Sequence, residues 1–125
     1  MKLREIPVAP ELIGRADGEE TMTAWQQVCG VDEIEQDSGR RFDFGGRTFA
    51  IFRSGSDEFF CTDGLCTHEA VHLADGLLMD YELECPKHAG VFDIRTGEAK
   101  RLPACVNLRT YPIRIDGGVV FVGLG

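Results

Sequence analysis

The pattern that most constrains this chain is a pair of short cysteine–histidine motifs within residues 66–88. The first motif places Cys66 two positions before His68, the second places Cys85 three positions before His88, and sixteen residues separate the two motifs. Each motif offers one thiolate and one imidazole, and four such donors can bind either a zinc ion or an iron–sulfur cluster. The pattern therefore predicts a fold that brings two loops together around a metal centre.

The order of the four ligands and the residues between them bear on which metal is bound. In zinc fingers the two cysteines come together and the histidines follow, commonly on a helix, whereas here cysteine and histidine alternate. Gly76 and the alternating residues 77–84 favour a β-hairpin over a finger helix. The pattern favours a cluster clamped by two loops, and a zinc-stabilised interaction module is the alternative.

With these motifs the chain resembles the Rieske family, in which two histidines replace two cysteines on one iron of a [2Fe–2S] cluster. The C-x-H motif, the sixteen-residue spacing, the C-x-x-H motif and residues 89–97 are similar to Rieske ferredoxins of bacterial aromatic-ring-hydroxylating oxygenase systems. The resemblance covers approximately residues 25–123. It implies an electron carrier rather than an enzyme.

The resemblance also implies a ligand set and partners. One [2Fe–2S] cluster would be held by Cys66 and Cys85 on the inner iron and by His68 and His88 on the outer iron. The chain would be a soluble ferredoxin that carries single electrons from an NAD(P)H-dependent, flavin-containing ferredoxin reductase to a non-haem iron terminal oxygenase. The alternative function is an accessory Rieske subunit of a reductase such as assimilatory nitrite reductase.

Four residues near the motifs bear on the reduction potential. At the positions where high-potential Rieske proteins carry a disulfide and two hydroxyl donors, this chain has Val71, Lys87, Gly90 and Phe92. Hydrogen bonds to the cluster sulfurs stabilise the reduced cluster, and these donors are missing here. We therefore expect a potential toward the low end of the Rieske range of about −150 to +300 mV.

Length, charge and cysteine content limit the function further. The 125 residues make one domain and are too few for an oxygenase with its own catalytic iron domain. The formal net charge of −8 argues against nucleic acid or an anionic membrane as partner. Cys29, Cys61 and Cys105 show no disulfide spacing, so we expect reduced, partly buried thiols. The sequence shows no signal peptide and no long apolar run, so we expect the protein to be cytoplasmic. We also expect it to be a monomer.

The rest of the sequence predicts an all-β fold. Alternating residues 41–44 and 47–53 flank two glycines and predict a hairpin, and residues 108–115 and 119–122 predict a second, closing hairpin. Trp25 is predicted to begin the first strand and to lie in the core. The expected fold class is Rieske-like, with an antiparallel β sandwich or barrel as base and a small inserted cluster-binding subdomain of two ligand loops.

The predicted boundaries are an N-terminal arm at residues 1–22, a Rieske domain at residues 23–125, and a cluster-binding subdomain at about residues 63–104. The arm shows no sustained hydrophobic period. Because the ligand set is complete without it, His72 is predicted to be an exposed loop histidine. Asp93 is predicted to pair with Arg95 across a turn.

Two further expectations concern the surface around the cluster. Residues 102–104 match the place where Rieske proteins carry a proline-containing loop, which would exclude water from the cluster. The histidine edges are expected to be surrounded by a small apolar patch with acidic residues at its rim. The predicted members of that patch are Val71, Val91, Leu102 and Pro103.

Overall fold

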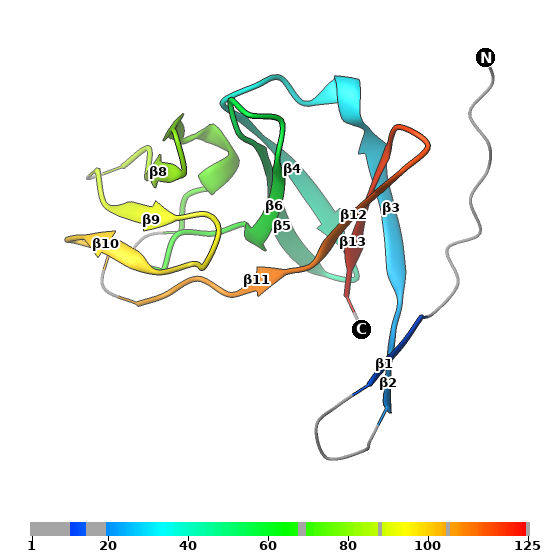
Figure 1. Cartoon of the computed structure of the whole chain (residues 1–125). Coiled ribbons are helices and arrows are strands. Elements are labelled where there is room, and N and C mark those ends of the chain that lie inside the picture. Colours follow the sequence, from blue (N-terminus) through cyan, green and yellow to red (C-terminus); the bar gives the residue numbers. More distant parts are fainter. Residues whose placement is uncertain (1–10, 15–19, 68–69, 88, 105, 125) are drawn as a thin grey trace. The chain divides into compact units, whose positions relative to one another are not determined.

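The structure, a computed structural model, divides into two compact units (Figure 1). One unit is formed by Met1–Glu33 with Tyr111–Gly125, and the other, which contains both cysteine motifs, by Ile34–Thr110. The predicted arm and domain boundaries do not follow this division and stay a prediction. The residues that the structure describes are 11–14, 20–67, 70–87, 89–104 and 106–124.

The first sheet of the Ile34–Thr110 unit has the strand order β11-β6-β5-β4. Its strands are β4 (Ser38–Phe44), β5 (Arg47–Arg53), β6 (Phe59–Asp63) and the short β11 (Thr110–Tyr111). Strands β4 and β5 are antiparallel and joined by Gly45 and Gly46, whose φ angles of 62° and 77° suit glycine in a tight hairpin turn. The predicted hairpin is confirmed.

The second sheet of this unit lies between and beyond the two motifs and has the order β10-β9-β8-β7. Its strands are β7 (Leu77–Met79), β8 (Glu82–Glu84), β9 (Val91–Asp93) and β10 (Ala99–Arg101). Strands β7 and β8 pair antiparallel, which confirms the hairpin predicted between the motifs. A short 3₁₀ turn, η2 (Leu73–Asp75), precedes β7.

The two sheets of this unit share one apolar core. Strand β5 contributes Phe52 and the second sheet contributes Leu83 and Phe92, each fully buried. Burying a side chain of this size stabilises the fold by about 1.5–3 kcal/mol. Because both cysteine motifs begin at this core, the packed sheets give the loops a rigid base.

The unit formed by the chain ends contains two separate sheets. Its elements are β1 (Glu11–Gly14), β2 (Glu20–Thr23), β3 (Trp25–Gly30), η1 (Val31–Glu33), β12 (Ile113–Asp116) and β13 (Val119–Gly123). Strands β12, β13 and β3 form one sheet, which confirms the closing hairpin, and β1 pairs with β2. Strand β1 and most of β2 fall within the predicted arm, residues 1–22.

Two buried-residue predictions have different outcomes. Cys29 and Cys61 are buried free thiols, as expected, and Cys105 lies outside the described residues. Burial, together with the negative charge of Asp63, raises the pKa of Cys61 to about 12, so this thiol stays protonated. Trp25 is only half-buried rather than a core residue, and its ring lies 5.8 Å from the Arg114 guanidinium.

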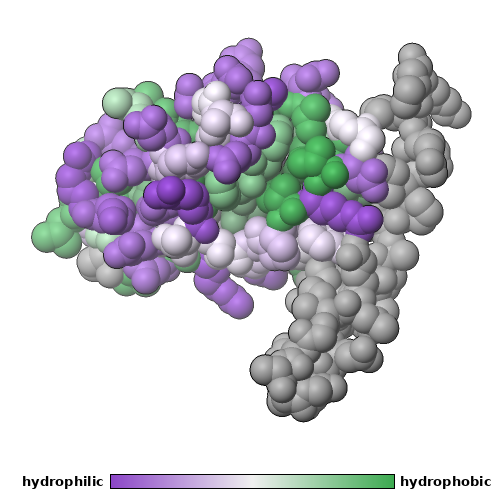
Figure 2. All heavy atoms as spheres, viewed as in Figure 1, coloured by the Kyte–Doolittle hydropathy of each residue, from purple (hydrophilic) through white to green (hydrophobic). Residues whose placement is uncertain are grey.

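The surface over strands β8, β9 and β10 is mostly hydrophilic in the view of Figure 2. Large apolar side chains that are exposed are few among the described residues, and those of the Ile34–Thr110 unit are Phe44, Leu65, Leu77, Met79, Leu102 and Val106. Within the described residues, no helix has the length and apolar character needed to cross a membrane.

Candidate metal centre

The cysteines of the two motifs lie in the same buried core. Cys66 follows β6 and Cys85 follows β8, and both pack in the cluster that contains Phe92 and Ala104. Their exposed fractions are only 7% and 3%, and both are free thiols. The fold therefore brings two of the predicted ligands, which are nineteen positions apart in the sequence, into one core.

The same backbone contact closes both cysteine-containing loops. The Cys66 N–H donates to the carbonyl of Val71 at 3.0 Å, and the Cys85 N–H donates to the carbonyl of Gly90 at 2.7 Å. Each bond spans five residues and defines a six-residue loop, which we call the first ligand loop (residues 66–71) and the second ligand loop (residues 85–90). The sequence did not predict that the two loops have the same length, because their closing hydrogen bonds depend on backbone geometry alone.

Along each ligand loop the chain passes from the core to the surface. Thr67 and Ala70 are exposed in the first loop, and Lys87 and Ala89 are exposed in the second. His68 and His88 lie outside the described residues, so the structure brings together two of the four predicted ligands. The assignment of all four ligands stays a prediction.

The first ligand loop is fixed to the β4–β5 hairpin through Gly64. The Gly64 N–H donates to the Thr48 carbonyl at 3.0 Å, and the Gly64 carbonyl accepts from Leu73 N–H at 2.7 Å. A Cβ at Gly64 would lie 2.9 Å from the Thr48 carbonyl carbon and 2.7 Å from His72 Nε2. Only glycine fits between the strand and the histidine, so this backbone approach holds the loop close to β5.

His72 differs from its prediction as an exposed loop histidine. It is half-buried, forms an isolated bridge with Leu65, and caps η2 by accepting the Ala74 N–H at its Nδ1. Its Nε2 lies 2.9 Å from Thr48 Oγ1. The prediction was wrong because the partner hydroxyl lies 24 positions earlier in the sequence.

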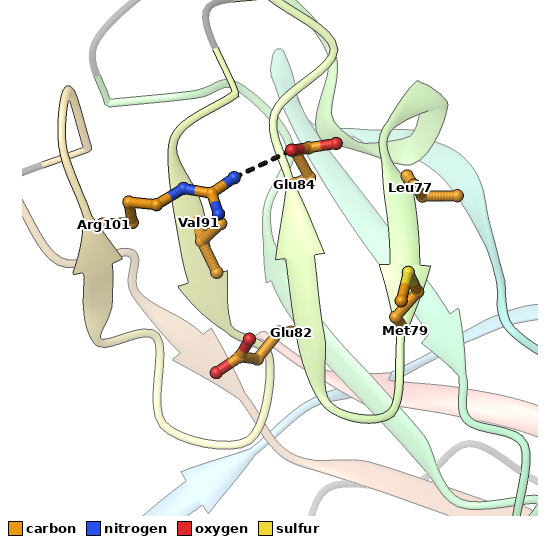
Figure 3. Close-up of a pocket in the computed structure, with 6 residues that line it drawn as sticks. All are labelled: Leu77, Met79, Glu82, Glu84, Val91 and Arg101. Carbon is orange, nitrogen blue, oxygen red and sulfur yellow. Dashed lines mark hydrogen bonds and ion pairs between the residues drawn. The ribbon is translucent and has the colours of Figure 1, made fainter.

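The second ligand loop is fixed by an arginine from β10. Arg101 donates to the Ala89 carbonyl from Nε at 3.1 Å and from Nη2 at 2.8 Å, and Nη2 also contacts Glu84 Oε2 at 2.8 Å. Figure 3 shows this ion pair beside a hollow that Leu77 and Met79 also line. Glu84 precedes Cys85 and Ala89 follows His88, so Arg101 bridges the two ends of the second ligand loop.

The predicted proline-containing loop, residues 102–104, contacts the second ligand loop, and Val106 just after it contacts the first. Thr67 Oγ1 donates to the Val106 carbonyl at 2.7 Å, and a Cβ at Gly90 would lie 2.9 Å from both Cβ and N of Ala104. The Leu102–Pro103 peptide bond is cis. These contacts place Ala104 and Val106 beside the predicted cluster site, and the role of residues 102–104 in excluding water stays a prediction.

The predicted Asp93–Arg95 pair is present and is more than a surface contact. Asp93 is buried and accepts from Arg95 N–H, Nε and Nη2, and these hydrogen bonds lower its pKa. The Arg95 guanidinium lies 4.2 Å from the ring centroid of Tyr81. Tyr81 in turn donates to Glu58 and packs edge-on against Phe60. The pair therefore ties the end of β9 to the turn between β7 and β8.

The donors that the structure describes fit an iron–sulfur cluster. Two buried cysteines lie in an apolar core at the bases of loops whose described residues Thr67, Ala70, Lys87 and Ala89 are exposed. Thiolates are the usual ligands of such clusters, and burial limits access of water to the cluster sulfurs. Among the described residues no three His, Cys, Asp or Glu side chains gather as a metal site, since both motif histidines lie outside them.

Comparison with known proteins identifies the family. Residues 24–112 match the Rieske [2Fe-2S] domain, which is most of the chain. The chain belongs to the Rieske [2Fe–2S] domain family, has its all-β fold and carries one Rieske-type [2Fe–2S] cluster. Within that family it is a ferredoxin of the kind that serves aromatic dioxygenase systems, an electron-transfer component rather than a catalyst.

Three similar proteins support this conclusion. The ferredoxin subunit of anthranilate 1,2-dioxygenase from Burkholderia cepacia is 39% identical over 107 residues, which cover 86% of this chain and 98% of that protein. The ferredoxin of carbazole 1,9a-dioxygenase from Nocardioides aromaticivorans has a TM-score of 0.76 at 30% identity, covering 81% of this chain and 98% of that one. A ferredoxin solved in a complex of reduced oxygenase and oxidised ferredoxin of carbazole 1,9a-dioxygenase has a TM-score of 0.74 at 30% identity, with 79% and 92% covered.

Proposed function

We propose that Cys66, His68, Cys85 and His88 hold the cluster, and that the chain carries single electrons from an NAD(P)H-dependent, flavin-containing ferredoxin reductase to a non-haem iron terminal oxygenase. The observation that carries this proposal is the pair of equally closed loops, each with a buried free cysteine at its start. When bound, the cluster supplies one-electron oxidation and reduction. The chain's own residues hold it, shield it and present it to partners.

The change in exposure along each loop supports different roles for cysteine and histidine. Cys66 and Cys85 lie in the core, while the neighbours of the histidines, such as Thr67 and Lys87, are exposed. Cysteines on an inner iron and histidines on an outer iron fit this direction. The imidazole edges would then be the nearest protein groups to a partner, and electrons would enter and leave there.

The apolar groups beside these loops support a small docking surface. Leu102 is 74% exposed, and Val106 and Leu65 are also exposed, all on segments bonded to or continuous with the ligand loops. Val91, predicted to belong to the patch, is buried, so that part of the prediction is wrong. We expect a contact below about 1,200 Å², as is usual for transient electron-transfer complexes.

A cytoplasmic monomer is part of the same proposal. Free buried thiols at Cys29 and Cys61 suit a reducing compartment, where disulfides do not persist. The net charge of −8 favours weak docking against a basic partner surface, and such attraction raises the association rate more than the affinity.

The cluster assignment is tested by comparing Cys85→Ala with Cys61→Ala. Both remove a buried free thiol, but only Cys85 belongs to a ligand loop. We expect equal amounts of iron and acid-labile sulfide and a low average g value in the reduced wild type, complete loss of colour in Cys85→Ala, and colour retained in Cys61→Ala. Zinc without sulfide in the wild type, or colour retained in Cys85→Ala, would overturn the assignment.

The direction of electron flow is tested with purified partners. We expect the chain to be reduced by a ferredoxin reductase with NAD(P)H and reoxidised by a ring-hydroxylating oxygenase, with rates that fall as salt screens the acidic surface. A nitrite reductase subunit is the less supported alternative, because relatives at 33–39% identity are ferredoxin components of dioxygenase systems. Reoxidation only by a nitrite reductase would favour that alternative.

A further inference from the structure

His72 lies at the base of the first ligand loop without being a predicted ligand. Its backbone bridges to Leu65, directly before Cys66, and the following Leu73 N–H bonds to the Gly64 carbonyl. Its ring contacts two different elements, the start of η2 through Ala74 and strand β5 through Thr48. One side chain thus joins the end of the first ligand loop to the β4–β5 hairpin.

The hydrogen-bond donors and acceptors around His72 fix its protonation state. Arg41 and Thr48 both donate to Asp43 and hold the pKa of that carboxyl below its usual range, so Asp43 is an ionised acceptor. Thr48 has only one hydroxyl proton, which it gives to Asp43, so its oxygen must accept from His72 Nε2–H. Nδ1 must then be unprotonated, since it accepts the Ala74 N–H at 3.2 Å. The ring is neutral and its proton is on Nε2.

A second proton on His72 would break this arrangement. An Nδ1–H would face the Ala74 N–H, so two donors would meet and the cap of η2 would be lost. The ring has little room to turn away, because Gly64 packs so closely that a Cβ there would lie 2.7 Å from Nε2. Protonation must therefore move the ring, the cap or the segment that carries the first ligand loop.

We infer that His72 is a positioning residue of the iron–sulfur site, which holds the first ligand loop on the β4–β5 hairpin while its ring is neutral and releases the loop when its ring is protonated. The inference rests on the proposed function, since it assigns Cys66 and His68 of that loop to the cluster. His72 acts through the loop and is not itself a ligand.

The charges around the ring agree with a neutral resting state. Burial lowers the pKa of His72, and the positive charge of Arg41 on β4 lowers it further, whereas Asp75 on η2 and Asp43 on β4 act in the opposite direction. Thr48 on β5 is neutral. Because the pKa is lowered in the folded protein, the contribution to stability is complete above about pH 6.5, the value of a free histidine, and is lost as the pH falls below it.

The experiment measures the rate at which the holoprotein loses its visible colour between pH 8 and pH 5. His72→Asn keeps a good N-cap but cannot titrate, Thr48→Val removes the hydroxyl, and Thr48→Ser is the matched control that keeps it. At pH 8 we expect His72→Asn and Thr48→Val to lose the cluster about fivefold faster than wild type, the effect of one hydrogen bond, and Thr48→Ser to stay within about twofold.

The pH profile separates positioning from a merely structural role. As the pH falls from 8 to 5, we expect the ratio of the His72→Asn rate to the wild-type rate to fall toward one, because the wild type also loses the contact. A pH effect that every variant shares cancels in this ratio. A ratio of one at pH 8, or a ratio that stays constant with pH, would overturn the inference.

Hydrogen exchange gives a readout that does not depend on the cluster assignment. We expect the peptide covering residues 64–76 to exchange faster at pH 8 in His72→Asn than in wild type, after correction for the intrinsic exchange rate. If the wild type lacks iron and sulfide, the proposed function fails while this measurement still tests the contact. Unchanged exchange in that peptide would reject the positioning role.

Discussion

The two ligand loops are closed in the same way but anchored by different chemistry. In both, the cysteine N–H bonds to the carbonyl five residues later. The first loop is held by the close packing of Gly64, which is buried, and by the neutral ring of His72, which is half-buried. The second is held by the charged Arg101, whose side chain is 56% exposed where it meets Glu84.

This difference teaches that the two halves of one metal site can respond to different conditions. A close-packed neutral anchor depends on shape and on the protonation of one imidazole. An exposed ion pair is screened by salt and contributes only about 0–1 kcal/mol. We therefore expect the first loop to be sensitive to packing and acid, and the second to ionic strength.

The largest expected effect comes from adding a methyl group beneath each loop. In Gly64→Ala the new Cβ would meet the backbone of β5 at 2.9 Å from the Thr48 carbonyl carbon, whereas in Gly90→Ala it would meet Ala104 in the proline-containing loop. We expect a loss of about 3 kcal/mol in the free energy of unfolding for Gly64→Ala and about 1 kcal/mol for Gly90→Ala, because a connecting loop shifts more easily than a central strand.

Urea unfolding of the holoprotein measures both values. Gly30→Ala is the control, since a Cβ there has no neighbour closer than 3.5 Å, and we expect its change to stay within about 0.5 kcal/mol. Equal losses for the two loop glycines would show that the anchors are equally rigid and would contradict the comparison.

A smaller effect is expected from removing the charged anchor of the second loop. Arg101→Met removes the contacts with Ala89 and Glu84, and Lys100→Met is the matched control on the same strand. At low salt we expect Arg101→Met to lose its visible colour about threefold faster than wild type, which is typical of an exposed pair. With added NaCl the difference should narrow, because the ion pair with Glu84 is screened, while the hydrogen bonds to the Ala89 carbonyl remain. A difference that does not narrow with salt would contradict a charged anchor.

The sequence was sufficient for the parts of the site that are local. The two motifs, the β7–β8 hairpin and the double-glycine hairpin follow from spacing, alternation and turn residues over a few positions. The family followed from the motifs themselves, and the match to residues 24–112 confirms it.

The anchors could not be predicted because they join residues distant in the sequence. Thr48 precedes His72 by 24 positions, and Glu84 precedes Arg101 by 17, so no local pattern relates them. For the same reason His72 was taken for an exposed histidine. Val91 was placed in a surface patch, although β9 pairs on both sides and buries it.

The smallest expected effect is a difference in the pH at which the segments around the first and second ligand loops lose their protection from hydrogen exchange. Burial and Arg41 lower the pKa of His72, so its contribution is lost as the pH falls below about 6.5. Asp93 lies just beyond the second ligand loop, and hydrogen bonds from Arg95 lower its pKa. Its contribution to the stability of the fold is therefore present above the unfolded carboxyl pKa of about 3.9 and is lost only below that pH.

Hydrogen exchange at a series of pH values, corrected for intrinsic rates, measures this order. Between about pH 6 and pH 4 we expect residues 64–76 to lose protection while residues 85–95 keep it, because the anchor of the first loop needs a neutral His72, whereas Asp93, whose pKa lies below the usual carboxyl value, stays ionised. Asp93→Asn should lower the protection of residues 85–95 at every pH, since an uncharged amide accepts less strongly from Arg95 and does not titrate. Loss of protection in both peptides at the same pH would show that the loops are coupled and that their separate anchors do not control them.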